Sequence, residues 1–228
     1  MDYFQQFLFG IYPYVAATIF LLGSLIRFDR EQYTWKSDSS QLLKRGQLRW
    51  GSNLFHIGIL FLFFGHAVGL LTPHHIYEGL GLSISAKQLL AMVSGGLAGL
   101  LCLAGIALLL HRRLSEPRIR KTSKPMDIFI LLWIFITLLL GLTTILFSMR
   151  HLEGSEMLAL SAWAQHIVTF RGDAAAYVVN VPIIYKVHLF FGMTLFLLFP
   201  FSRLVHIWSG FASLGYLTRA YQVVRQKA

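Results

Sequence analysis

Five long apolar stretches constrain the fold of this 228-residue chain more than any other feature of its sequence. Four of them contain no Asp, Glu, Lys or Arg and cover residues 4–26, 54–71, 88–110 and 128–149. The fifth, residues 187–208, holds one charge, Arg203, near its end, where a long side chain can reach the lipid headgroups. Each stretch can cross a bilayer as a helix. We therefore predict an all-α integral membrane protein, with residues 1–228 forming one domain built as a bundle of five transmembrane helices.

The distribution of basic residues predicts the orientation of this bundle. Of the 20 Lys and Arg residues, all but Lys87, Arg150, Arg171 and Lys186 fall in the connections 27–49 and 112–124 or in the C-terminal part of the chain from Arg203 onward. The positive-inside rule then places the N-terminus outside and the C-terminus in the cytoplasm. Membrane topology thus accounts for the formal charge of +10, and we expect a lipid bilayer and no nucleic acid as the surroundings of these basic residues.

The single cysteine, the start of the chain and the polar connections predict further properties of the protein. The single cysteine, Cys102, excludes an internal disulfide and an iron–sulfur cluster held by this chain alone. We expect the first apolar stretch to be retained as a helix, because it is far longer than the apolar core of a signal peptide and no basic segment precedes it. Residues 150–186 are predicted to form an interfacial helix plus a loop that covers an outward-facing site. The loop 28–50 and the tail 209–228 are predicted to dock a cytoplasmic protein, with solvent or lipid headgroups as the alternative.

Four histidines lie within the apolar stretches, His56 and His66 in the second and His188 and His206 in the fifth. Because these two stretches run in opposite directions, His66 can face His188 near the outer side and His56 can face His206 near the inner side. Each pair can supply the two axial nitrogens of a haem iron, although a single buried histidine is more often bonded to a backbone carbonyl. We therefore predict two haems.

The helical geometry of these pairs is imperfect. As one continuous helix, the fifth stretch would place its two histidines on one face about 27 Å apart, whereas those of the second stretch would lie only about 15 Å apart and be rotated by roughly 80°. Tilted helices and haems would have to absorb the difference. The glycines around these histidines, Gly58, Gly65, Gly69 and Gly192, are compatible with room for a flat porphyrin. Close helix packing, for which Gly65 and Gly69 or Gly95 and Gly99 are equally suited, is the alternative.

Other polar residues are candidates for binding roles. Arg112 and Arg203, with Arg113, lie at the depth of the inner pair and are candidate contacts of haem propionates, with phospholipid contacts as the alternative. Lys87 lies at the level of the outer pair and is a candidate donor to a quinol oxygen, with His66 or Glu78 as proton acceptor. Lys87 and Lys186 are also compatible with simple anchoring at the membrane surface.

The chain also resembles a known family over nearly its whole length. The similarity is carried by long strings: IYPY, QYTWKSDSSQ, SNLFHIGIL, GHAVGLLTP, RRLSEPRIR, HLEGSEM, WAQHIVTF, GMTLFLLFPFSRLVHIW and YLTRAYQVVR. These resemble the gamma subunit of membrane-bound respiratory nitrate reductase. The resemblance implies two b-type haems, held by His66 with His188 and by His56 with His206. It also implies a quinol site at Lys87, Gly65 and His66. At Lys186 the family has arginine, so no bidentate role follows there.

The resemblance further implies a function in electron transport at the bacterial cytoplasmic (inner) membrane. A gamma subunit of this kind oxidises a membrane quinol and anchors an iron–sulfur beta subunit and a molybdenum-containing alpha subunit that reduces nitrate to nitrite. Two alternatives stay open from the residues alone. The first is a dihaem anchor of another cytoplasmic reductase, for instance one that acts on sulfur compounds. The second is a proton-coupled transporter that uses the membrane histidines as a relay, although the inverted repeats common in transporters are absent from the sequence.

Overall fold

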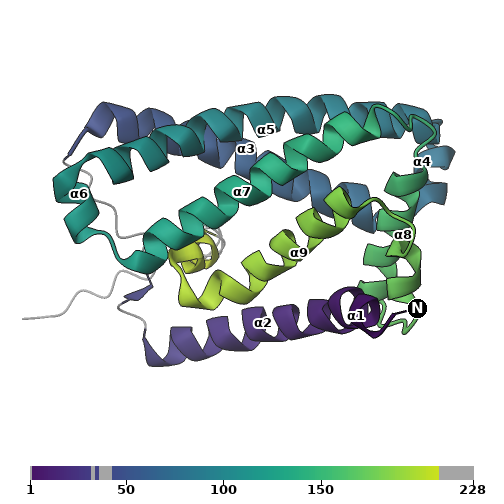
Figure 1. The fold of residues 1–228 in the computed structure, drawn as a ribbon, viewed down its shortest axis with the longest axis horizontal. Coiled ribbons are helices and arrows are strands. Elements are labelled where there is room, and N and C mark those ends of the chain that lie inside the picture. The colour runs from purple at the N-terminus through teal and green to yellow at the C-terminus, as the bar shows by residue number, and fades with distance from the viewer. Residues whose placement is uncertain (1, 32–33, 36–42, 211–228) are drawn as a thin grey trace, which may run out of the picture.

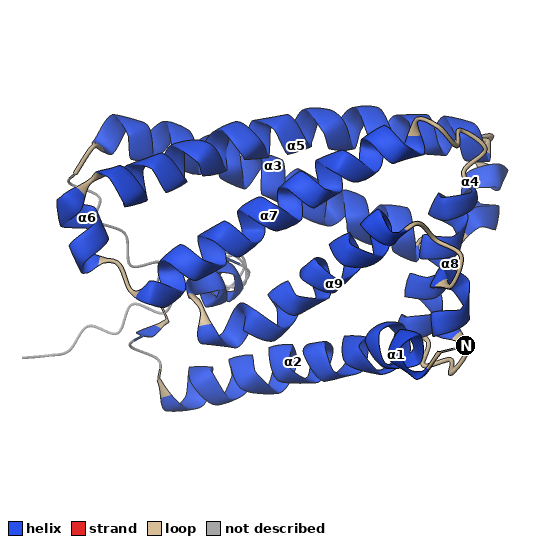
Figure 2. Cartoon of the chain, in the orientation of Figure 1, coloured by secondary structure: helices blue, strands red, loops and turns tan. Residues whose placement is uncertain are grey.

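A computed structural model describes residues 2–31, 34–35 and 43–210, and these residues are helical with connecting loops and no strand (Figures 1 and 2). Five helical segments are long and apolar enough to cross a membrane, as predicted. The first combines α1 (Tyr3–Gln6), η1 (Phe7–Ile11) and α2 (Tyr12–Arg30). The others are α3 (Arg45–Leu71), α5 (Ile84–Ser115), α7 (Pro125–Ser148) and α9 (Ile183–Leu198) with η4 (Phe199–Phe201).

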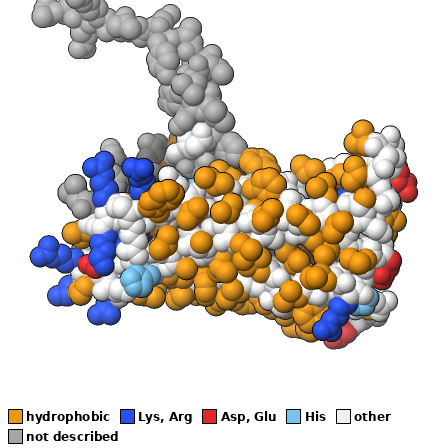
Figure 3. Space-filling view, turned by 90° about the horizontal axis from the view of Figure 1, so that it is seen from above, with side chains coloured by type: hydrophobic (Ala, Val, Ile, Leu, Met, Phe, Trp, Pro, Cys, Tyr) orange, Lys and Arg blue, Asp and Glu red, His pale blue; other side chains and the backbone are white. Residues whose placement is uncertain are grey.

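Shorter helices lie at the two ends of the bundle (Figure 1). One end carries α4 (His74–Gly79), α8 (Ser155–Val168) and η3 (Ala174–Val178), and the other carries α6 (Pro117–Thr122) and η5 (Arg203–Val205). In the face seen in Figure 3, hydrophobic side chains cover the middle, and most of the Lys and Arg side chains gather at the end where α6 lies. This separation of charge is what a membrane-embedded bundle with one basic side requires.

The first span departs from regular α-helix near Pro13. Proline has no amide hydrogen, so the carbonyl of Phe9, four residues earlier, loses its normal α-helical donor. The chain forms a π-turn there, and the indole Nε1 of Trp163 in α8 donates to the Phe9 carbonyl oxygen at 2.9 Å. The carbonyl that Pro13 leaves without an α-helical donor in the first span thus binds α8 through Trp163.

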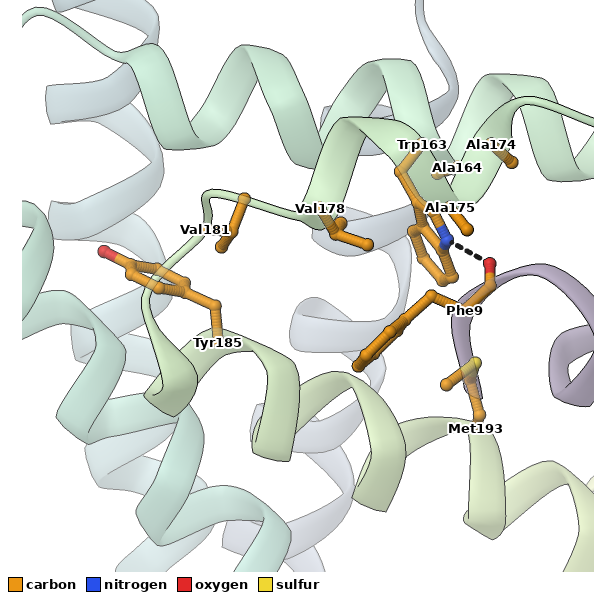
Figure 4. Close-up of a cluster of buried hydrophobic side chains, with 9 residues drawn as sticks. All are labelled: Phe9, Trp163, Ala164, Ala174, Ala175, Val178, Val181, Tyr185 and Met193. Atoms are coloured by element: carbon orange, nitrogen blue, oxygen red, sulfur yellow. Dashed lines mark hydrogen bonds between the residues drawn. The ribbon is translucent and has the colours of Figure 1, made fainter. Parts of the chain in front are cut away.

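The helix predicted within residues 150–186 is confirmed as α8, which runs across the end of the bundle (Figure 1), and its position at the membrane interface stays a prediction. A cluster of buried hydrophobic side chains surrounds Trp163 (Figure 4). On its other side α8 contacts the end of α3, where Ser161 Oγ donates to the Gly69 and Leu70 carbonyls at 3.1 and 3.2 Å. Because the last carbonyls of a helix have no partner within it, these bonds cap α3.

Helices α3 and α5 pack closely because both carry glycines at their contact. A Cβ added at Gly58 would lie 2.6 Å from the backbone nitrogen of Cys102, and one at Gly105 would collide with the backbone of Phe55. Gly58 therefore serves helix packing, so the prediction that it leaves room for a porphyrin is wrong.

The prediction of one continuous helix over residues 187–208 is also wrong. α9 ends at Leu198, a 3₁₀ turn containing Pro200 follows, and Ser202 is extended with φ −121° and ψ 178°. A second 3₁₀ turn, η5, then leads to His206, and the chain there has left the direction of α9 (Figure 1). Pro200 can supply no amide hydrogen bond and its ring clashes with the preceding turn, which favours a break in the helix at this point.

We predict that Trp163→Phe destabilises the protein by about 1–3 kcal/mol, because it removes the donor to the buried Phe9 carbonyl and leaves a void. The measurement is the apparent melting temperature of the detergent-solubilised protein. Trp50→Phe is the control, because Trp50 is 62% exposed on α3. Equal melting temperatures for the two variants would contradict the role of the Trp163 bond.

Candidate functional site

Two pairs of histidines face each other across the bundle. His66 of α3 and His188 of α9 have ring centroids 6.1 Å apart, and His56 of α3 and His206, which follows η5, are also 6.1 Å apart. The structure thus brings together the partners that opposite helix directions predict. The break in span five explains how this happens, because His206 no longer lies on the helix that carries His188 and the spacing of a continuous helix does not apply.

The separation within each pair suits two imidazoles on opposite sides of one metal ion. A ligating imidazole nitrogen lies about 2 Å from its metal ion and about 1 Å from the centroid of its own ring, which gives centroids about 6 Å apart. Within residues 2–31, 34–35 and 43–210, no group of three or more His, Cys, Asp or Glu side chains could hold a metal ion. Each histidine pair therefore suits a metal whose other ligands belong to a prosthetic group, as in haem.

All four histidines are oriented by the same kind of hydrogen bond. The Nδ1 atoms lie 2.6–3.1 Å from backbone carbonyl oxygens: His56 from Ser52, His66 from Leu62, His188 from Thr137 and His206 from Arg203. A carbonyl oxygen only accepts hydrogen bonds, so Nδ1 carries the proton and the Nε2 atom of the neutral ring keeps its lone pair. Metal-ligating histidines are commonly oriented by such a bond from their second nitrogen.

Three glycines beside these histidines face open space. A Cβ added at Gly65, Gly69 or Gly192 would meet nothing within 4 Å, in contrast to the packed Gly58. Gly95 is also open, whereas a Cβ at Gly99 would lie 2.6 Å from Leu142. The outer pair therefore has the room that a flat macrocycle needs, and the residues present fit a haem.

Sequence reasoning missed the contribution of α7 to this site. His188 Nδ1 donates to the carbonyl of Thr137 at 3.1 Å, and a Cβ added at Gly141 would lie 2.9 Å from Cε1 of the same ring. In one turn of α7, the Thr137 carbonyl thus orients the His188 ring, and Gly141 leaves the space in which the ring lies. Gly141 carries no signal in the sequence, because it lies 47 residues before the side chain that it accommodates.

Lys87 is buried, with 6% of its surface exposed, at the start of α5. Its Nζ lies 3.9 Å from the centroid of the Tyr77 ring, and the Tyr77 hydroxyl donates to the Val68 carbonyl at 2.8 Å. Val68 is two residues after His66 on α3. The ammonium is therefore fixed against α4 near the end of α3 that follows His66. Glu78, the alternative acceptor, pairs with His74 at 3.3 Å.

The predicted propionate contacts have partners within the protein. Arg112 donates to the Leu43 carbonyl at 2.7 Å, and Arg203 Nε lies 3.7 Å from a carboxylate oxygen of Asp127, which also pairs with Arg113 at 3.5 Å. Their contact with propionates stays a prediction. Lys186 Nζ donates to the Val179 carbonyl at 2.7 Å, and its role as a membrane anchor or in quinol binding stays a prediction.

The connection 150–186 carries a hydrogen bond between His166 and Asp173. Nδ1 of His166 donates to a carboxylate oxygen of Asp173 at 2.7 Å, and this bond lowers the pKa of the exposed Asp173 carboxyl. The pair joins α8 to the loop that leads into η3. It thereby fixes the connection that covers the outer end of α3.

The fold and the site together define a class: an integral membrane helix bundle with two opposed histidine pairs, each suited to a prosthetic group. Comparison with known proteins is more specific. Residues 5–227 match the family described as nitrate reductase gamma subunit. The chain is 53% identical to the respiratory nitrate reductase 1 gamma chain of Escherichia coli (strain K12) over 227 residues, covering 100% of both chains.

Two further relatives agree. The respiratory nitrate reductase 2 gamma chain of Escherichia coli (strain K12) is 53% identical over 228 residues, which cover 100% of this chain and 99% of that one. The nitrate reductase gamma chain of Bacillus subtilis (strain 168) is 38% identical over 223 residues, or 98% and 99% of the two chains. The chain belongs to the nitrate reductase gamma subunit family, as its sequence motifs predict.

We predict that Gly141→Ala lowers the haem content of the purified protein, because the new Cβ displaces the His188 ring. Gly95→Ala is the matched control on a neighbouring helix, since a Cβ there meets open space. The measurement is haem per chain from the absorbance of the pyridine complex. Normal haem content in Gly141→Ala would show that the clearance at His188 is not needed.

Proposed function

We propose that this chain is the dihaem b-type cytochrome subunit of a respiratory nitrate reductase. In this role it oxidises a membrane quinol near the periplasmic face and delivers the electrons to cytoplasmic partner subunits. Those partners are an iron–sulfur beta subunit and a molybdenum-containing alpha subunit, where nitrate is reduced to nitrite. The quinol-oxidising half of the enzyme reaction then belongs to this chain, in the bacterial inner membrane.

The observation that carries the proposal is the geometry of the histidine pairs. In both pairs the rings are 6.1 Å apart, and in all four rings the Nδ1 proton is donated to a carbonyl, which directs each Nε2 lone pair to metal binding. Four histidines that were only hydrogen-bonded to carbonyls would not be expected to form two facing pairs with the same separation.

The residues of the chain would hold two haems at separate places. His66 and His188 would hold the outer haem near α4 and α8, and His56 and His206 would hold the inner one near the basic end of the bundle. When bound, the haems would supply one-electron redox centres for electron transfer.

The proposed quinol site lies where Lys87 meets the outer end of α3. The ammonium of Lys87 donates to a quinol oxygen, and Gly65 leaves room for the ring beside His66. A quinol releases two protons when it is oxidised, so the site needs acceptors that open to the outside. Glu78 and His74, whose side chains lie 3.3 Å apart on α4, are on that side and provide the exit.

The basic end of the bundle is the proposed docking face for the partner subunits. In the structure Trp35 Nε1 donates to Ser209 Oγ at 2.9 Å, so the loop after α2 contacts the start of the C-terminal tail. Residues 211–228 of the predicted docking tail lie outside the described residues. We propose that this end faces the cytoplasm, because it carries most of the Lys and Arg residues.

We predict that His66→Ala removes the outer haem and abolishes quinol oxidation, because one of its two axial nitrogens is lost. Electron paramagnetic resonance of the purified complex should then retain one of two low-spin haem signals. His111→Ala is the control: His111 lies on α5 outside both pairs and bonds to Gln47 at 3.0 Å. Persistence of both signals in His66→Ala would defeat the ligand assignment.

We predict that Lys87→Ala raises the KM for quinol by about tenfold, the effect of one charge-assisted hydrogen bond, and leaves both haems in place. Lys186→Ala is the matched control on the same side of the membrane. The measurement is steady-state quinol oxidation with haem content determined in parallel. An unchanged KM in Lys87→Ala would exclude a contact between Lys87 and quinol.

A further inference from the structure

The break in span five is held by three residues on one face of α2. These are Phe20, Gly23 and Arg27, which follow each other at helical spacing, and we call them the α2 seat. None of them belongs to the histidine pairs or to the quinol site. All three contact the segment between the end of α9 and Trp208.

Arg27 binds the backbone of the break directly. Its Nη1 donates to the carbonyl oxygens of Pro200 and Ser202 at 2.7 and 2.8 Å, and its Nη2 donates to the Thr34 carbonyl at 3.1 Å. Carbonyls at the end of a helix lack partners, and inside a membrane such groups must be satisfied by the protein. The planar guanidinium satisfies these carbonyls because its two terminal nitrogens donate in different directions. A lysine ammonium would have to make all of its bonds from one nitrogen.

Gly23 and Phe20 complete the seat. A Cβ added at Gly23 would lie 2.8 Å from Cγ of Pro200, so the proline ring packs directly on the backbone of α2. The Phe20 ring contacts Phe199 before the break at 4.8 Å and Trp208 after it at 5.4 Å, measured between ring centroids. The seat therefore fixes the chain on both sides of the turn.

The position of His206 follows from this turn. Ser202 is the last residue of the break that Arg27 binds, and η5 leads from it to His206 in a single turn. His206 Nδ1 donates to the carbonyl of Arg203 at 2.6 Å, so the direction of its ring is set by the backbone of η5. Any shift of the Pro200–Ser202 segment moves the imidazole away from His56.

We propose that the α2 seat positions His206, and that Arg27 and Gly23 are positioning residues for the inner haem. The inference rests on the proposed function, since it assigns these residues to one of the two haem sites. Span one thus contributes to haem binding without supplying a ligand.

The test is electron paramagnetic resonance with redox titration of the purified complex, comparing the wild type with Arg27→Gln and Gly23→Ala. We expect the inner low-spin haem to shift its signal and midpoint potential or to be lost, while the outer haem keeps both. Arg27→Lys retains the charge and part of the bonding, so its inner signal should lie between those of the wild type and Arg27→Gln.

Two control variants match the changes in charge and in size. Arg30→Gln removes an exposed cation from the same helix, and Gly46→Ala adds a Cβ in open space at the same end of the bundle. Both should keep the two wild-type signals. Equal loss of both haems in Arg27→Gln and Gly23→Ala, or no change in either haem, would overturn the proposal. A wild-type complex without haem signals would instead refute the proposed function itself.

Discussion

The hydrogen bond from each membrane histidine to a backbone carbonyl is the interaction on which the rest of the site depends. It fixes the tautomer, so that Nε2 keeps its lone pair, and it fixes the direction in which that lone pair points. Three of the four carbonyls lie in the turn just before the histidine itself, and only His188 uses another helix. The outer pair is therefore sensitive to the packing of α7, and the inner pair to the backbone that precedes His206.

The helices around the histidines are packed so that the His66 side of α3 stays open while the rest of the helix is held in place. On α3, Gly58 presses against Cys102 of α5, whereas Gly65 and Gly69, further along, face open space beside His66. Glycines of one helix thus lie in two environments, a close helix contact at Gly58 and open space at Gly65 and Gly69 that suits the proposed haem. The end of α3 is capped by Ser161 of α8, and α8 is itself bonded through Trp163 to the π-turn of the first span. Through α8, these contacts connect the end of α3 that carries His66 to the π-turn of the first span.

Much of this arrangement could be predicted from the sequence, and the reasons for the failures are physical. The length of the apolar stretches predicts five spans, and the basic connections between them predict the direction of each span. His66 is therefore expected opposite His188 and His56 opposite His206, because helix direction follows from the order of the spans along the chain. The apolar length of residues 187–208 predicts one helix and gives no sign of the break, for which Pro200 is the only local signal in the sequence. Gly141 and Arg27 could not be predicted, because their partners, His188 and the Pro200 carbonyl, are distant in sequence and meet only in the folded bundle.

We propose that each opposed pair of imidazoles holds one iron. Near-infrared magnetic circular dichroism of the purified wild-type complex, combined with haem quantitation per chain, tests this proposal. We expect two b-type haems for each copy of this chain, both with the charge-transfer band of bis-histidine ligation. A single haem per chain, or a band that indicates an axial ligand other than histidine on either iron, would contradict it.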